Sequence, residues 1–321
     1  MFMASFDVTD LYTNVPLIET INICLKLLND GTNNILGLPL KDFRTMLELS
    51  VFNSVFLFNG KFYKQTDGLV MGLPLSPTLA NIFLCYWEKI WLNQCPNHFK
   101  PAYFRRYVDD CFILFHHESH AELFLQYLNS KHDNIKFTCE TENNKKLAFL
   151  DCLIDRTNNG FTSSVYRKPT FTGQGLSFFS FSPLIYKINS IRTLIFRAYN
   201  ICSNMTSLSK EFSFLVRYFN ANGFPKCLIY SHIQKFINKL QNQRPVVQTV
   251  NRKDMYLSLP YLGPTSDKLK LDLEKITLKY FPFIKLHVVF VNLCTLTSLF
   301  KYKDVLPSSM RSSIIYKYCV R

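Results

Sequence analysis

The stretch Tyr107-Val108-Asp109-Asp110 sets the expected fold of this chain. Two adjacent carboxylates stand between two short apolar runs, the second of which is 111–115. Apolar runs of this length that are rich in aromatic residues favour β-strands, so the acidic pair is expected at the turn of a hairpin. Two carboxylates at the tip of a buried hairpin are costly unless a positive charge neutralises them. Mg²⁺ is the natural candidate, because it is commonly held by one or two carboxylates together with substrate phosphates.

An isolated Asp-Asp pair is more often part of a surface β-turn, but a second segment favours the metal site. An apolar start leads into Asp7, and apolar residues at spacings of three and four follow from Pro16, which suits the first turn of a helix. Asp7 is therefore expected at the end of a strand, where a rigid element holds it. Tyr12 lies close enough along the chain to line the same pocket. The plain alternative is an ordinary strand-to-helix turn, which often carries Asp.

A third segment, residues 68–83, combines a loop rich in glycine and proline with a helix start. Ser76 followed by Pro77 is typical of an N-cap and a first-turn proline. The loop before them predicts a tight group of backbone N–H groups that can approach a nucleotide or a template base pair. The alternative is a plain helix entry with an aromatic core stripe, and Trp87 and Trp91 are expected to be core.

Together the three segments resemble motifs A, B and C of reverse transcriptases, in the right order along the chain. More narrowly, the chain is similar to the Penelope-like retroelements over nearly its whole length. The stretches that carry this similarity are SFDVT at 5–9, TNVP at 13–16, LAFLD at 147–151 and VYRKPT at 165–170. The departures are mild, because Asp10 and Leu73 stand where the family usually has Ser, and Tyr12 stands where it usually has Phe. None of them removes a metal ligand.

The resemblance implies an RNA-directed DNA polymerase, a nucleotidyltransferase that joins a primer 3′ hydroxyl to the α-phosphate of a deoxynucleotide. Two Mg²⁺ ions, or Mn²⁺ in their place, would stabilise the attacking and leaving oxygens. The catalytic residues would be Asp7, Asp109 and Asp110. Asp7 and Asp109 would hold both ions, together with the backbone carbonyl of Val8. Asp110 would be either a further ligand or a group that tunes the charge of the site.

The resemblance also implies contacts to the substrates. Tyr12 would be the steric gate that excludes a ribose 2′-hydroxyl, and Met71 and Gly72 would line the nascent base pair. The expected primer and template contacts are Tyr107, Arg167, Lys168, Arg192 and Arg197. For Arg167 and Lys168 the alternative is a solvated basic turn, because phosphate contacts leave little trace in a sequence.

The composition is consistent with a polyanionic partner. The chain has 321 residues, a net charge of +14 and 48% hydrophobic residues. Contacts of Lys and Arg to phosphate release counterions, so the expected partners are an RNA template, a DNA primer or RNA–DNA duplex, and deoxynucleotides. No apolar run is long enough to span a membrane, and no membrane association is expected. The ten cysteines form no C-x-x-C pair, which indicates reduced thiols in the nucleus or cytoplasm.

The predicted fold class is α+β: a right-hand polymerase palm with an antiparallel sheet and helices, a helical thumb and a small α/β connector. The palm is expected over 1–175, the basic thumb over 176–250 and the connector over 251–321. The connector pattern is strand, helix from about 264 to 280, strand over 288–291, and a shorter helix. Compared with the family, the fingers and the GIY-YIG endonuclease domain are expected to be missing, so the chain is interpreted as a fragment.

Two functions from different classes fit these observations. The first is the polymerase itself, which the intact Asp7, Asp109 and Asp110 favour. The second is a catalytically inactive nucleic-acid-binding remnant, or a domesticated protein that keeps the fold. A telomerase-like role would rest on family kinship alone, and fold analogy does not establish function.

Overall fold

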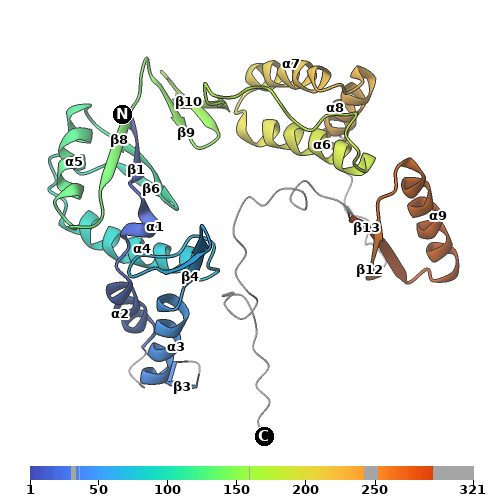
Figure 1. Ribbon diagram of the computed structural model, residues 1–321. Coiled ribbons are helices and arrows are strands. Elements are labelled where there is room, and N and C mark those ends of the chain that lie inside the picture. The colour runs from blue at the N-terminus through green and yellow to red at the C-terminus, as the bar shows by residue number, and fades with distance from the viewer. Residues whose placement is uncertain (30–33, 36, 159, 242–251, 292–321) are drawn as a thin grey trace, which may run out of the picture. The chain divides into compact units, whose positions relative to one another are not determined.

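The computed structural model describes residues 1–29, 34–35, 37–158, 160–241 and 252–291. These residues form two compact units, the first from Met1 to Leu150 and the second beginning at Asp151 (Figure 1). Helices and antiparallel strands occur together in the first unit, so the predicted α+β class is confirmed. Within the described residues, no helix is both long enough and apolar enough to cross a membrane.

A four-stranded antiparallel sheet is the frame of the first unit. Its strands, in spatial order, are β6 (Tyr103–Tyr107), β7 (Asp110–Phe115), β1 (Phe2–Val8) and β8 (Phe137–Thr141). The first strand of the chain therefore lies between two strands that follow it by more than a hundred residues. Because of this crossover, segments remote in the sequence meet at the end of β1.

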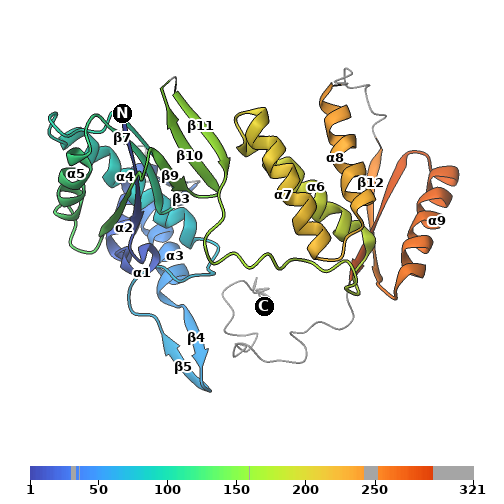
Figure 2. The same cartoon turned by 90° about the horizontal axis from the view of Figure 1, so that it is seen from above.

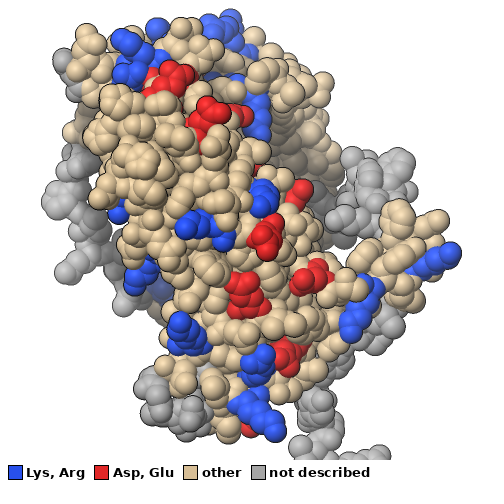
Figure 3. All heavy atoms as spheres, turned by 90° about the vertical axis from the view of Figure 1, so that its left-hand side faces the viewer, with Lys and Arg blue, Asp and Glu red and all other residues tan. Residues whose placement is uncertain are grey.

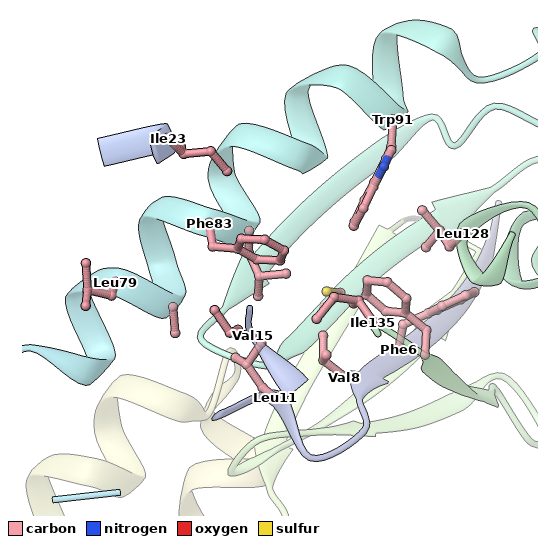
Figure 4. Packing of buried hydrophobic residues seen from close by; sticks show 14 of the residues in the cluster. Phe6, Val8, Leu11, Val15, Ile23, Leu79, Phe83, Trp91, Leu128 and Ile135 are labelled. Atoms are coloured by element: carbon pink, nitrogen blue, oxygen red, sulfur yellow. The ribbon is translucent and has the colours of Figure 1, made fainter. Parts of the chain in front are cut away.

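The sheet buries one face under helices. In β1 the side chains alternate, so that Ala4, Phe6 and Val8 are buried while Asp7 is exposed. Among the helices that share the core with β1 and β7 are α2 (Leu17–Leu28), α4 (Ser76–Gln94) and α5 (Ser119–Asn129). Figure 4 shows Phe6 and Val8 of β1 close to Leu128 and Ile135, with Phe83 and Trp91 reaching in from α4. Full burial of a side chain such as Phe6 stabilises the fold by about 1.5–3 kcal/mol.

The helix predicted after the glycine-rich loop is confirmed, but its first residue differs from the prediction. Ser76 is the first helical residue and Leu75 is the N-cap. The buried Ser76 hydroxyl instead donates a hydrogen bond to the Val70 carbonyl, at 2.7 Å. Ser76 therefore ties the loop back onto the helix. Trp91 is buried as predicted, while Trp87 is half-buried and donates its indole N–H to Glu19.

The remaining elements of the first unit lie along the chain around this frame. They are α1 (Leu11–Asn14), β2 (Asn34–Ile35), β3 (Leu38–Pro39), α3 (Leu40–Phe52), β4 (Val55–Phe58), β5 (Lys61–Lys64) and β9 (Lys146–Phe149). Asn59-Gly60 is a strong hairpin signal in the sequence, and the antiparallel β4–β5 pair confirms it. Both turn residues have positive φ, 49° and 72°, as a type I′ turn requires. Figure 2 shows this hairpin projecting from the body of the unit.

The second unit contains a hairpin, three helices and a βαβ segment. Its elements are β10 (Cys152–Thr157), β11 (Gly160–Val165), α6 (Leu184–Ile201), α7 (Met205–Ala221), α8 (Lys226–Gln241), β12 (Lys253–Pro260), α9 (Pro264–Tyr280) and β13 (Ile284–Val291). The helices α6, α7 and α8 enclose a core of their own, in which Ile195, Leu215 and Ile229 are buried. The strands β12 and β13 flank α9 in the sequence, as the connector pattern predicted, although β13 begins at Ile284 and not at residue 288. The two strands pair in parallel. The shorter helix predicted after residue 291 lies outside the described residues.

The two compact units divide after Leu150, so the β10–β11 hairpin, which was predicted as part of the palm, belongs to the second unit. The reason is that the β10–β11 hairpin bonds to the helices that follow it. The Ser163 hydroxyl donates to the Ile201 carbonyl, and the Ser203 hydroxyl accepts from the Ser163 amide at 2.9 Å. The division into palm, thumb and connector stays a prediction.

Candidate active site

The acidic pair lies at the turn of the β6–β7 hairpin, as the sequence predicted. Tyr107 and Asp110 face each other as the last strand pair, and Val108 and Asp109 form the two-residue loop. Val108 has a φ of 57°, which is unusual for a β-branched residue. Such a conformation costs on the order of 1–3 kcal/mol and persists only where surrounding contacts enforce it, often at functional sites.

Pairing between β1 and β7 brings Asp7 to this turn. Asp7 and Asp110 are direct partners across the two strands, so their side chains leave the same face of the sheet. The amide of Val8 donates to the carbonyl of Asp109 at 3.3 Å, which fixes the end of β1 against the loop. The strand register therefore brings Asp7 next to Asp110 and to the loop that carries Asp109, although about a hundred residues separate Asp7 from the pair.

The electrostatics of Asp7 reflect this gathering of acids. Partial burial of its carboxyl group raises the pKa of Asp7, and the Asp109 carboxylate raises it further. A hydrogen bond from the Val8 amide acts in the opposite direction, and Glu140 and Asp10 add to the rise. Among the described residues, neither Asp7 nor Asp109 forms an ion pair with Lys or Arg. A divalent cation would relieve this repulsion.

The donor set fits an oxygen-seeking cation, but not as a complete protein cage. Within the part of the chain that the structure describes, no group of three His, Cys, Asp or Glu side chains is arranged to hold a metal ion. The role of the three carboxylates as metal ligands therefore stays a prediction. What the structure presents is Asp7 beside Asp109, and two carboxylates completed by substrate phosphates are a usual arrangement for Mg²⁺.

The glycine-rich loop is attached to the segment that carries Tyr12. The amide of Leu69 donates to the Tyr12 carbonyl at 2.6 Å. Gly68 has a φ of 78°, and a Cβ there would lie 2.5 Å from the Thr13 carbonyl oxygen, so only glycine fits this approach. Tyr12 itself is half-buried and packs against the core, while Met71 is exposed.

The expected primer and template residues have different surroundings. Tyr107 is exposed beside Asp110, and Lys168 is exposed as well. Arg167 is not, because both of its terminal nitrogens bond to the carboxylate of Glu211 and its guanidinium lies 3.6 Å from the centre of the Phe214 ring. Arg167 therefore does not lie in a solvated turn, and its primer contact stays a prediction.

Arg192 and Arg197, the two arginines expected in the thumb, differ in the same way. Arg197 forms an ion pair with Asp151, with 3.1 Å between the charged atoms. Arg192 lines a groove of about 640 Å³ between α6 and α8, and it has no carboxylate partner among the described residues. The other residues that line this groove are Phe196, Tyr199, His232, Lys235, Phe236, Lys239 and Leu240. Figure 3 shows Lys and Arg interspersed with Asp and Glu on the face it draws, so the positive charge does not form one continuous field there.

Sequence reasoning missed two residues next to the acidic turn, Arg106 and Glu88. They form an ion pair beneath the turn, and burial raises the pKa of the Glu88 carboxyl while its bond to Arg106 opposes the rise. The signal was present, because strict alternation along β6 puts Arg106 on the face opposite Arg105 and Tyr107. The partner on α4 could not be read from that alternation.

Two family models match parts of this chain. A family model described as reverse transcriptase (RNA-dependent DNA polymerase) matches residues 2–174. A second, described as an animal helix-turn-helix domain, matches residues 174–234. No curated protein matches the chain in sequence.

Two similar solved structures are telomerases. One is telomerase from Candida albicans in complex with a TWJ fragment of telomeric RNA, with 14% identity over 75% of this chain and 43% of that chain and a TM-score of 0.46. The other is apo telomerase from Candida tropicalis, with 13% identity over 77% of this chain and 44% of that chain and a TM-score of 0.46. This chain spans less than half the length of either telomerase chain.

Proposed function

Because a family match over more than half of its length makes this chain a member of the reverse transcriptases, we propose that it is an RNA-directed DNA polymerase. It would add deoxynucleotides to a primer 3′ end by two-metal catalysis. The observation that carries the proposal is the pairing of β1 with β7, which places Asp7 beside Asp109 and next to Asp110.

The chain's own residues would act by holding and orienting charge. Asp7 and Asp109 would bind Mg²⁺, or Mn²⁺ in its place, with the Val8 carbonyl as a further donor and Asp110 adjusting the charge. The ions, when bound, would neutralise the triphosphate and lower the pKa of the primer hydroxyl. Without them the carboxylates would repel one another and the triphosphate. Partial burial, and after it the Asp109 carboxylate, already raise the pKa of Asp7.

The substrate contacts follow from the same proposal. Tyr12 would lie under the sugar of the incoming nucleotide, and Met71 and Gly72 would line the new base pair. The loop suits this role because Gly72 has a φ of 98°, a backbone conformation that residues with a side chain rarely adopt, and the space beside it is open. Tyr107 and Lys168 would face the primer, and Arg192 the template–primer backbone.

We also propose the narrower assignment to the Penelope-like retroelements. It is supported by the motif stretches at 5–9, 13–16, 147–151 and 165–170. With it come a palm, thumb and connector, an RNA template with a DNA primer, and a site of action in the nucleus or cytoplasm.

A second candidate function is nucleic-acid binding without catalysis. The groove between α6 and α8 favours it, because its lining combines Arg192, Lys235 and Lys239 with aromatic side chains, and these three cations have no carboxylate partner among the described residues. Basic and aromatic side chains in one groove can bind phosphates and stack bases without any chemistry.

The test is extension of a labelled DNA primer on an RNA template by the purified chain, with deoxynucleotides and Mg²⁺. We expect extension by the wild type and at least a roughly thousandfold loss in Asp109→Asn, about 4 kcal/mol of transition-state stabilisation. The amide keeps the shape of the side chain and removes the charge that holds the ion, so binding to the duplex should stay within about twofold. Binding without extension would favour the second candidate, and an active Asp109→Asn would exclude this site.

A further inference from the structure

Arg106 is a buried cation directly beneath the acidic turn. Only 6% of its side chain is exposed, and 16% of that of Glu88 on α4, with which it pairs. The two groups share two hydrogen bonds, one from Nε and one from Nη2, the latter at 3.2 Å. A charge this buried is tolerated only when its partners are fixed in good geometry. The pair therefore links the end of β6 rigidly to α4.

The same guanidinium also reaches the loop. Arg106 Nη1 donates to the Val108 carbonyl at 2.7 Å and to Asn81 Oδ1 at 3.1 Å. Val108 is the residue in the left-handed conformation, which a β-branched side chain disfavours. The next carbonyl, that of Asp109, accepts from Val8. Both carbonyls of the two-residue loop are thus held, one by β1 and one by Arg106.

We propose that Arg106, held in place by Glu88, is a positioning residue that keeps the Val108–Asp109 loop in the conformation in which Asp109 faces Asp7. Arginine suits the role because its planar fork can bond Glu88, Asn81 and Val108 at once, whereas a lysine ammonium cannot match that geometry. This inference deepens the proposed function and rests on it for its meaning, although the metal-binding test below does not require polymerase activity.

The chain contains a matched control one residue away. Arg105 has the same charge and lies in the same strand, but it is exposed on the opposite face, where its guanidinium lies over the Tyr103 ring. Arg106→Lys and Arg105→Lys therefore make the same chemical change on the two faces of β6. A difference between them reports the contacts of Arg106, not a lost charge.

The first measurement is binding of Mn²⁺ alone to the purified chain, followed by electron paramagnetic resonance, with Asp7→Asn defining the signal from this site. We expect Arg106→Lys to weaken Mn²⁺ binding at least tenfold, Glu88→Gln to weaken it less, and Arg105→Lys to leave it unchanged. In primer extension the Arg106→Lys variant should lose kcat while its KM for the template–primer stays within twofold. Equal Mn²⁺ affinities for Arg106→Lys and wild type would overturn the proposal.

A rescue experiment separates positioning from simple support of the fold. Glycine adopts positive φ at little cost, so Val108→Gly relieves the strain that Arg106 opposes. Added to Arg106→Lys, it should recover several-fold of the lost Mn²⁺ affinity, without requiring a change in melting temperature. No recovery, in a variant that melts cooperatively, would reduce Arg106 to a fold-stabilising residue. If the wild type binds Mn²⁺ through Asp7 but extends no primer, the proposed function fails while the positioning role is still decided by binding.

Discussion

Acidic side chains at the end of β1 and basic side chains in the second unit are treated in opposite ways by this fold. Partial burial is the main reason why the pKa of Asp7 is raised, and the neighbouring carboxylates raise it further. In the second unit Arg167 is bonded to Glu211, and Arg197 to Asp151. The first region keeps like charges together, whereas the second pairs these two arginines with carboxylates.

The difference separates charges that serve a ligand from charges that serve the fold. Holding like charges close together destabilises a fold. Such an arrangement is therefore expected mainly where a ligand of opposite charge offsets the repulsion when it binds. A cation that is paired with a carboxylate already has its charge and its N–H groups engaged, so it binds a phosphate less strongly. By this criterion the acidic turn is the stronger functional candidate, and Arg192 is a stronger one than Arg167 or Arg197.

The largest effect is expected where a structural ion pair is broken. Glu211→Ala should lower the free energy of unfolding of the second unit by about 3 kcal/mol, because it leaves the partly buried Arg167 without a partner. Asp151→Ala, the control, should cost less than about 1 kcal/mol, since the Asp151 side chain is largely exposed. Urea unfolding of both variants measures the difference. Similar costs would mean that the two arginines are not distinguished by burial.

Tyr12 sharpens the acidic side of the comparison. As a steric gate it excludes a ribose 2′-hydroxyl by shape, so Tyr12→Ala should raise the ratio of ribonucleotide to deoxynucleotide incorporation by roughly 10–100-fold. The half-buried ring also packs against the core, so some stability should be lost as well. The ratio of the two incorporation efficiencies is the measurement. If both activities fall together, Tyr12 contributes packing alone.

The two arginines of α6, Arg192 and Arg197, are expected to give a smaller effect that tests the same distinction. Arg192→Ala should reduce the slope of log K against log salt concentration for duplex binding by roughly 0.9, the loss of one phosphate contact. Arg197→Ala should reduce it less, because Asp151 already neutralises that guanidinium. Binding is followed by fluorescence anisotropy from low to moderate salt. A larger change for Arg197 would reverse the ranking drawn from the ion pairs.

The smallest effect concerns the stability of the metal-free protein. A carboxyl whose pKa is raised in the folded state favours its protonated form there, so its charge destabilises the fold above that pKa. Asp7→Asn should therefore raise the melting temperature slightly at pH 7 without metal. The gain should vanish below the ordinary pKa of Asp, where the carboxyl is protonated in both states. A destabilised Asp7→Asn at pH 7 would show that the carboxylate bonds favourably within the fold.

Much of the fold was readable from local patterns. The hairpin at Asn59-Gly60, the helix beginning beside Pro77 and the strand–turn–strand around Asp109 all depend on neighbouring residues, whose spacing is visible in the chain. The prediction that Ser76 caps the helix was wrong, because its hydroxyl donates a hydrogen bond to the Val70 carbonyl instead. This bond depends on the path of the tight loop before the helix, which the residues at the helix start do not reveal.

By itself the sequence determined which elements form and that carboxylates stand at the ends of two of them. Periodicity, turn residues and caps act over a few positions, so their information is local. Only the tertiary structure decided which residues distant in the sequence contact one another. In the folded chain Asp7 lies opposite Asp110 across two strands, and Arg106 forms an ion pair with Glu88. Arg167 bonds to Glu211, which lies 44 residues away in the sequence. These contacts depend on strand register and on helix packing. Many contacts between distant residues set both of them together, so no local stretch of sequence specifies them.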